Sequence, residues 1–152
     1  MEASSKPQAE VHRLLREGYF AEINTALAYI QLSHNLKGFN GQIVRDLIEP
    51  DIDEEFGHAK KLASRLFALG YPVPSAFDVR NAEFSEGQNE MSNASSPELS
   101  VSAIMKAELE AIEIYKALIE QAELANDPAT ADLASDLLAD EEEHFRVMSS
   151  LL

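Results

Sequence analysis

The chain has 152 residues, with 27 acidic against 12 basic side chains and no cysteine. The absence of cysteine excludes disulfides, thiolate metal sites and iron–sulfur clusters, so any metal must be held by carboxylates and imidazoles. The net charge of -15 disfavours nucleic acid and anionic lipid as partners. No apolar run approaches the about 18 residues of a membrane span, and the N-terminus lacks a secretory pattern. We therefore expect a single domain over residues 1–152, in the cytoplasm and without membrane contact.

Helical periodicity and chain breaks predict four long helices, at about residues 8–37, 42–69, 97–125 and 128–151. Pro50 should kink the second helix or restart it. Residues 71–96 lack helical periodicity over most of their length, so we expect them to cross over the length of a bundle. Ser95 with Glu98 predicts a capping box for the third helix, and Asp127 before a proline predicts the start of the fourth. The predicted fold class is all-α: a four-helix bundle with a long crossover between helices 2 and 3.

Each predicted helix has an apolar stripe at spacings of three and four residues, and each stripe contains one glutamate at an apolar position. These glutamates are Glu22, Glu55, Glu108 and Glu141. Ser33 is also a polar residue on the apolar stripe of the first helix, but its hydroxyl can form a hydrogen bond to the backbone of its own helix. Four ionised carboxylates in an apolar bundle would repel one another and lose solvation. We therefore expect cations to compensate them.

The second and fourth helices each carry a histidine three residues after the glutamate, in the strings Glu55-Phe56-Gly57-His58 and Glu141-Glu142-Glu143-His144. Residues three apart share one helix face, so each pair can reach the same ion. Two divalent ions would balance four glutamates, and oxygen ligands with one imidazole per ion suit iron or manganese better than zinc. The expected metal ligands are Glu22, Glu55, His58, Glu108, Glu141 and His144.

The same spacing occurs in both halves of the chain, which indicates an internal repeat of helix pairs. The glutamates of the first and third helices, and those of the two Glu-x-x-His strings, are each 86 residues apart (108 − 22 and 141 − 55). Tyr29 and Tyr115 each lie seven residues after the glutamate of their own helix. These tyrosines are either core aromatics whose hydroxyls bond to a carboxylate or participants in electron transfer. We expect the two halves to face each other around a pseudo-twofold axis.

Other titratable residues are expected to lie outside the site. The acidic residues that we expect to be solvated on other helix faces are Glu54, Glu110, Glu113, Glu142 and Glu143. His12 and His34 have no carboxylate partner at ligand spacing, so they are expected to be surface or structural histidines. Leu27, Ile30 and Phe56 are apolar residues on outer faces, which predicts a homo-oligomer of at least two chains.

One glutamate from each of two helices, with Glu-x-x-His from each of two others, is the pattern of di-iron carboxylate proteins of the ferritin-like superfamily. The chain resembles the bacterioferritin and bacterial ferritin branch most, through Asp140-Glu141-Glu142-Glu143-His144 and Ile52-Asp53-Glu54-Glu55-Phe56-Gly57-His58. This resemblance implies two iron ions, with manganese as the alternative. It also implies the ligand roles: terminal Glu22 and His58 on one ion, terminal Glu108 and His144 on the other, and bridging Glu55 and Glu141.

The resemblance further implies a ferroxidase that takes Fe(II) and oxidises it with O2 or H2O2, for iron storage or detoxification. Tyr29 stands where bacterioferritins place a tyrosine beside the centre. Phe56 stands where they place a haem-binding methionine, so no haem is predicted. Two alternatives remain open: a rubrerythrin-like peroxidase, catalase or oxidase with the same ligands, and a structural, Dps-like shell. The lack of a cysteine-bound module weakens the rubrerythrin alternative, and the net charge argues against DNA contact.

Overall fold

The computed structural model describes residues 5–152, and this part of the chain contains six helices and no strand. The four long helices are α1 (Lys6–Asn35), α2 (Gly38–Ala68), α5 (Pro97–Leu124) and α6 (Pro128–Ser149). Two short helices, α3 (Ala76–Asn81) and α4 (Glu86–Asn93), lie in the crossover. The predicted all-α bundle with a long crossover is confirmed, whereas the crossover is more helical than its sequence pattern indicated. Within the described residues, no helix is long and apolar enough to cross a membrane.

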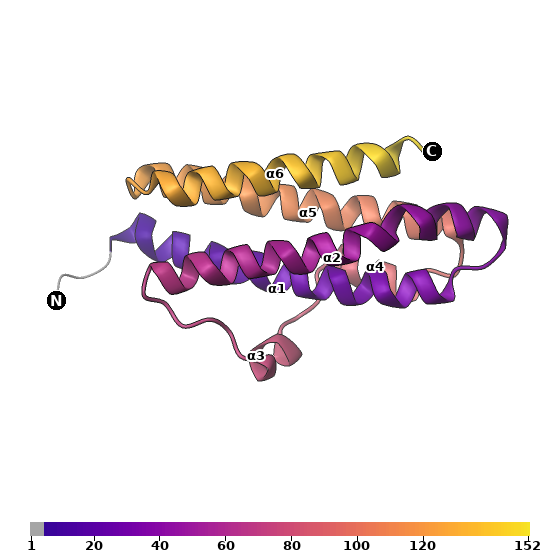
Figure 1. The fold of residues 1–152 in the computed structure, drawn as a ribbon, viewed down its shortest axis with the longest axis horizontal. Helices are drawn as coiled ribbons and strands as arrows, with labels where there is room; N and C mark the ends of the chain where they lie inside the picture. The colour runs from indigo at the N-terminus through magenta and orange to yellow at the C-terminus, as the bar shows by residue number, and fades with distance from the viewer. Residues whose placement is uncertain (1–4) are drawn as a thin grey trace.

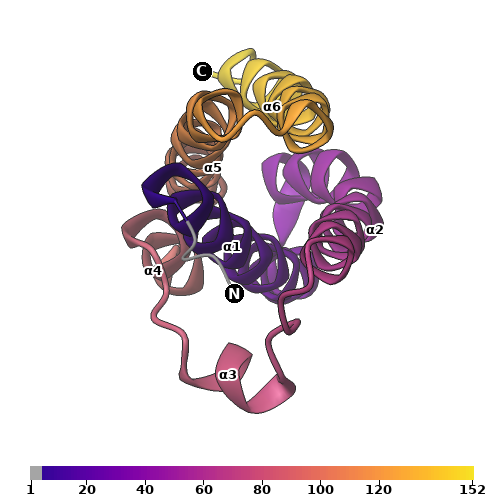
Figure 2. The same ribbon diagram turned by 90° about the vertical axis from the view of Figure 1, so that its left-hand side faces the viewer.

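α1 and α2 form one antiparallel hairpin, and α5 and α6 form the other (Figure 1). The end-on view in Figure 2 shows the four long helices around a common axis, with α4 beside α1 and α5. In the same view α3 stands away from the bundle. Because α2 and α5 run in the same direction, the segment between them returns along the length of the bundle.

Polar caps and first-turn prolines define where the helices begin. Asp127 accepts a hydrogen bond from a backbone N–H of the first turn of α6, as predicted. The predicted capping box of Ser95 and Glu98 is wrong, because the hydroxyl of Ser96 is the group that accepts from the Leu99 N–H. With Ser96 as the N-cap, the following proline takes the first helical position, where its missing N–H is not needed.

α2 runs through Pro50 as one helix, so the predicted restart does not occur. The helix ends at Ala68, and two residues later Gly70 has a φ of 82°, which glycine favours. There the Tyr71 N–H donates to the Leu66 carbonyl at 2.9 Å, which closes the last turn. In α1, the Ser33 hydroxyl donates to the Ile30 carbonyl at 3.1 Å, so the predicted bond to its own helix is present.

Two apolar clusters fill the bundle on either side of its middle. One includes Leu32, Ile48, Ile104 and Met148. The other includes Leu15, Leu62, Leu118 and Leu137. Along every long helix, the glutamate predicted on the apolar stripe lies between the residues of the two clusters. The hydrophobic free energy of these clusters, about 1.5–3 kcal/mol for each fully buried large side chain, offsets the cost of a polar middle.

Candidate metal centre

The six predicted ligand residues meet in the middle of the bundle, one from each of α1 and α5 and two from each of α2 and α6. All six residues are buried, and none is more than 6% exposed. Their ligand atoms form two overlapping groups, within each of which all atoms lie within 4.8 Å of one another. The groups are Glu22, Glu55, His58, Glu141 and Glu55, Glu108, Glu141, His144. Glu55 and Glu141 therefore belong to both groups.

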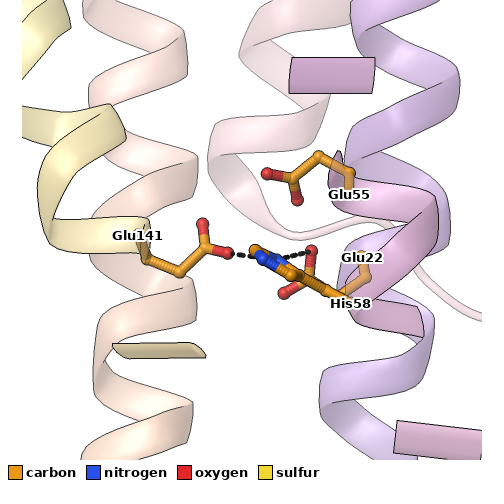
Figure 3. A group of neighbouring side chains, drawn as sticks. All are labelled: Glu22, Glu55, His58 and Glu141. Carbon is orange, nitrogen blue, oxygen red and sulfur yellow. Dashed lines mark ion pairs between the residues drawn. The ribbon is translucent and has the colours of Figure 1, made fainter. Parts of the chain in front are cut away.

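Each imidazole turns its Nδ1 atom toward the carboxylates of the centre. Figure 3 shows the first group, in which the His58 ring lies between Glu141 and Glu22. Its Nδ1 is 2.9 Å from Glu141 Oε1 and 3.4 Å from Glu22 Oε2. In the second group, His144 Nδ1 is 3.2 Å from Glu55 Oε1.

Buried polar atoms without a hydrogen-bond partner are concentrated at this centre. Among the described residues there are eight such side-chain atoms, and seven of them belong to the six predicted ligands. They include Nδ1 of both histidines and one oxygen of each glutamate. Such atoms lie close together but are not aligned for hydrogen bonds, and a carboxylate oxygen or one nitrogen of a neutral imidazole can each donate a lone pair to a metal ion. Because the donors are oxygens and imidazole nitrogens, the residues fit iron or manganese.

The electrostatics of the centre favour bound protons when no metal compensates the carboxylates. Burial raises the pKa of Glu55, and repulsion from Glu22 and Glu141 raises it further. Burial and Glu141 raise the pKa of Glu108 to about 8. Burial opposes the charged form of His58, but contacts with Glu141 and Glu22 outweigh it and raise the His58 pKa to about 10. A metal ion that binds here near neutral pH must therefore displace protons.

The two tyrosines donate hydrogen bonds to glutamates on the other helix hairpin. The Tyr29 hydroxyl donates to Glu108 Oε1, and the Tyr115 hydroxyl donates to Glu22 Oε1. Burial raises the pKa of both tyrosines, and the charge of the same glutamates raises it further, so both phenols stay neutral donors. Of the two predicted roles, the hydrogen bond to a carboxylate is present.

Three carboxylates on the Nε2 side of the histidines were missed by the sequence reasoning. Glu54 is exposed, as expected, yet its carboxylate also lies 3.2 Å from His144 Nε2 and 3.8 Å from His58 Nε2. Asp140 Oδ2 is hydrogen-bonded to His58 Nε2 at 3.0 Å, and Asp51 lies 3.6 Å from His144 Nε2. A signal was available, since Glu54 and Asp140 directly precede the motif glutamates and are 86 residues apart (140 − 54).

Glu110, also expected to be solvated, is partly buried and holds the start of α4. Its Oε1 accepts from the Ser85 hydroxyl at 2.8 Å and from the Gly87 N–H at 3.0 Å. The other acidic residues predicted on outer faces are exposed: Glu113, Glu142 and Glu143. His12 and His34 lie outside both groups of candidate ligands, as expected.

An antiparallel four-helix bundle with buried glutamates and two Glu-x-x-His strings defines the ferritin-like carboxylate class of proteins. The sequence profile of the family described as ferritin-like domain matches residues 13–152. The chain therefore belongs to the ferritin-like domain family.

Individual relatives include iron-related and DNA-protecting proteins. The DNA protection during starvation protein of Pyrococcus furiosus is 29% identical over 143 residues, which cover 91% of this chain and 75% of the relative. A ferritin-like, diiron-carboxylate protein of Bacillus anthracis is 24% identical, with a TM-score of 0.82 over 98% of this chain and 99% of that one. BfrA, a bacterioferritin of Mycobacterium tuberculosis, is 18% identical, with a TM-score of 0.78 over 97% and 84%. These two structures share the fold, and the predicted resemblance to ferritin-like di-iron proteins is confirmed.

Proposed function

We propose that the protein is a ferroxidase, which binds two Fe(II) ions as substrates and transfers their electrons to O2 or H2O2. The observation that carries this proposal is the pair of overlapping ligand groups, each with three buried carboxylates and one imidazole. Membership of the ferritin-like family supports iron as the metal. Manganese, which prefers similar ligands, is the alternative metal.

The proposed ligand roles follow from which residues the groups share. Glu22 with His58 and Glu108 with His144 would each hold one ion, and the shared Glu55 and Glu141 would bridge the two. Four carboxylates balance the charge of two divalent ions. Their attraction for iron grows when its charge rises from two to three, so the centre favours oxidation of the bound metal.

The electron balance is simple for either oxidant. Two Fe(II) ions each lose one electron, and O2 takes up two electrons and two protons to become H2O2. With H2O2 as the oxidant, the same two electrons and two protons give two water molecules. The buried centre holds both iron ions beside each other, so that one oxidant molecule can receive both electrons.

The test is an anaerobic titration with Fe(II), followed by exposure to oxygen. We expect saturation near two ions per chain and Fe(III) absorbance after oxygen is admitted. His144→Ala should lose the second binding step, whereas His34→Ala, at an exposed position, should bind iron like the wild type. Binding of one ion or none to the wild type would contradict the proposal. Rapid loss of peroxide without net iron oxidation would support the peroxidase or catalase alternative instead.

The similarity to a DNA protection during starvation protein favours a second candidate, a shell that protects DNA. The net charge of -15 disfavours contact with the phosphate backbone. Retention of DNA at physiological salt would support this candidate. Unchanged metal content in Glu55→Ala and Glu141→Ala would favour it further, because metal would then be incidental.

A further inference from the structure

We infer that the two halves of the chain hold each other's terminal ligands, so that each metal ion depends on positioning residues from the opposite half. The first half comprises α1 and α2, and the second comprises α5 and α6. The inference rests on the proposed function, because it concerns the ligands of the same two ions.

The glutamates are held by tyrosines of the opposite half. Tyr29 on α1 donates to Glu108 Oε1 on α5, and Glu108 Oε2 has no hydrogen-bond partner. Tyr115 on α5 donates to Glu22 Oε1 on α1, and Glu22 Oε2 is likewise without a partner. In both glutamates, one oxygen is therefore oriented by the other half, which leaves the second oxygen available to an ion.

The histidines face carboxylates of the opposite half. Asp140 on α6 is hydrogen-bonded to Nε2 of His58 on α2, while His58 Nδ1 has no hydrogen-bond partner. Glu54 on α2 lies 3.2 Å from Nε2 of His144 on α6, close enough for an ion pair but without a hydrogen bond, and neither ring nitrogen of His144 has a hydrogen-bond partner. Once a metal ion has displaced the Nδ1 proton, a carboxylate beside Nε2 favours the tautomer with its proton on Nε2, so that the Nδ1 lone pair faces the centre.

The four contacts are related by the internal repeat. Tyr29 and Tyr115 are 86 residues apart (115 − 29), and so are Glu54 and Asp140 (140 − 54). The tyrosines make the same hydrogen bond in the two directions. The carboxylates match in position, although Asp140 is hydrogen-bonded to its histidine and Glu54 only lies beside Nε2 of the other. The symmetry is incomplete, because Glu54 also lies 3.8 Å from His58 Nε2. Asp140 is therefore the cleaner residue to test.

Each ion therefore depends on positioning residues of the half that does not supply its terminal ligands. The ion held by Glu22 and His58 depends on Tyr115 and Asp140 of the second half. The ion held by Glu108 and His144 depends on Tyr29 and Glu54 of the first half. Loss of a residue that orients a metal ligand typically weakens metal binding by about 10–100-fold.

Titration of the full chain with Co(II), followed by its visible absorption, measures both ions without turnover. We expect Asp140→Asn to weaken the affinity for one of the two Co(II) ions by about 10–100-fold and to leave the affinity for the other unchanged. Asp140→Glu, which keeps the carboxylate, should restore part of the loss. The matched control is Glu142→Gln, which removes the same charge from an exposed position of α6 and should bind like the wild type.

Double variants show which ion is affected. Glu22→Gln weakens binding of the ion held by the first half, so adding Asp140→Asn should then reduce Co(II) affinity little further. Glu108→Gln weakens binding of the other ion, so adding Asp140→Asn should weaken binding of the remaining ion by about 10–100-fold. The reverse pattern, in which Asp140 supports the ion of its own half, would overturn the inference. Equal weakening of both ions, or none, would overturn it as well.

A second variant guards against a loss that comes from poor folding. Tyr115→Phe on α5 should weaken binding of the same ion as Asp140→Asn. Its control is Tyr19→Phe, which removes a tyrosine hydroxyl from α1 that is not part of the proposed contacts. Thermal unfolding of the metal-free variants checks that each is folded. A wild type that binds fewer than two Co(II) ions would overturn the proposed function together with the inference. A wild type that binds two, without the selective losses, would overturn the inference alone.

Discussion

Gly87 is required by the close approach of α4 to α5. A Cβ atom at this position would lie 2.5 Å from the Ala107 backbone nitrogen and 2.5 Å from Glu110 Oε1. Backbone cannot move aside as a flexible side chain can, so an added methyl group would push α4 away from its neighbour. Gly57, in the middle of α2, is a useful contrast, because a Cβ atom there would meet nothing within 4 Å.

We expect Gly87→Ala to lower the free energy of unfolding by about 1–3 kcal/mol, since it overpacks the contact between α4 and α5. Gly57→Ala should be neutral or should stabilise by up to about 1 kcal/mol, because alanine favours the helix. Unfolding by urea of both metal-free variants measures the difference. Equal midpoints for the two variants would show that α4 can move without cost.

At the scale of whole elements, one polar contact joins the two hairpins where α6 begins. Asp127 caps α6 through the Thr130 N–H at 3.1 Å and accepts from Arg65 of α2 at 2.8 Å. Arg65 also donates to the Thr130 hydroxyl at 2.8 Å. The same carboxylate therefore satisfies the first turn of one helix and the partly buried cation of another. The contact therefore links α2 to α6, and in both helices its residues are separated along the chain from those of the candidate metal centre.

Asp127→Ala should destabilise the protein by about 1–3 kcal/mol, because the helix loses its cap and Arg65 loses its partner. Asp127→Asn should be milder, since an amide oxygen can still cap the helix. Thermal unfolding checks both, with Asp132→Ala at an exposed position of α6 as the control. If Asp127→Ala and Asp132→Ala have the same midpoint of thermal unfolding, the contact does not stabilise the bundle.

For the whole molecule, the buried centre couples folding to protons and, if it binds the proposed ions, to metal. Burial raises the pKa of Glu108 from 4.5 to about 8 and that of Asp51 from 3.8 to about 6. Contacts with carboxylates overcome burial and raise the pKa of His58 from 6.5 to about 10. In each case the folded chain holds its proton more tightly than the unfolded chain. The stabilisation is present below the unfolded pKa and is lost as pH rises through the folded one.

The metal-free protein should therefore become less stable as pH rises from about 5 to 9. Added Co(II) should stabilise it more at pH 8 than at pH 6, because metal binding requires deprotonated ligands. Thermal unfolding across this range, with and without Co(II), measures both trends. Glu108→Gln should flatten part of the metal-free trend. A metal-free stability that increases with pH would contradict the coupling.

The outer face of α1 suggests how chains assemble. Leu27 is 48% exposed and Ile30 is 38% exposed, and residues three apart share one helix face. We expect light scattering to give a mass above the 16.8 kDa of one chain. Leu27→Glu should lower that mass, whereas Ser135→Glu, on an exposed part of α6, should not. A monomeric wild type would contradict the expected homo-oligomer.

The sequence predicted what depends on local order along the chain. Helix periodicity, Asp127 and the prolines placed the four long helices within a few residues, because these signals act within one or two turns. The repeated spacing of glutamates and histidines predicted which six residues meet, since it puts them at one level of a bundle. The contact of Glu54 was missed because its partner, His144, lies on α6, and only the 86-residue repeat that Glu54 shares with Asp140 points to it.

The helices of the crossover show the same limit. α4 is held by contacts to distant segments: Gln88 donates to the Ala21 carbonyl at 3.1 Å and to the Thr25 hydroxyl at 3.2 Å. The helix has only eight residues, and most of them are polar, so it offers no extended apolar stripe in the sequence. The sequence by itself therefore determined the fold class, the four long helices and the carboxylate and imidazole character of the candidate centre. Only the packing of one hairpin against the other decided which half orients which ligand, because that depends on contacts between residues far apart in the chain.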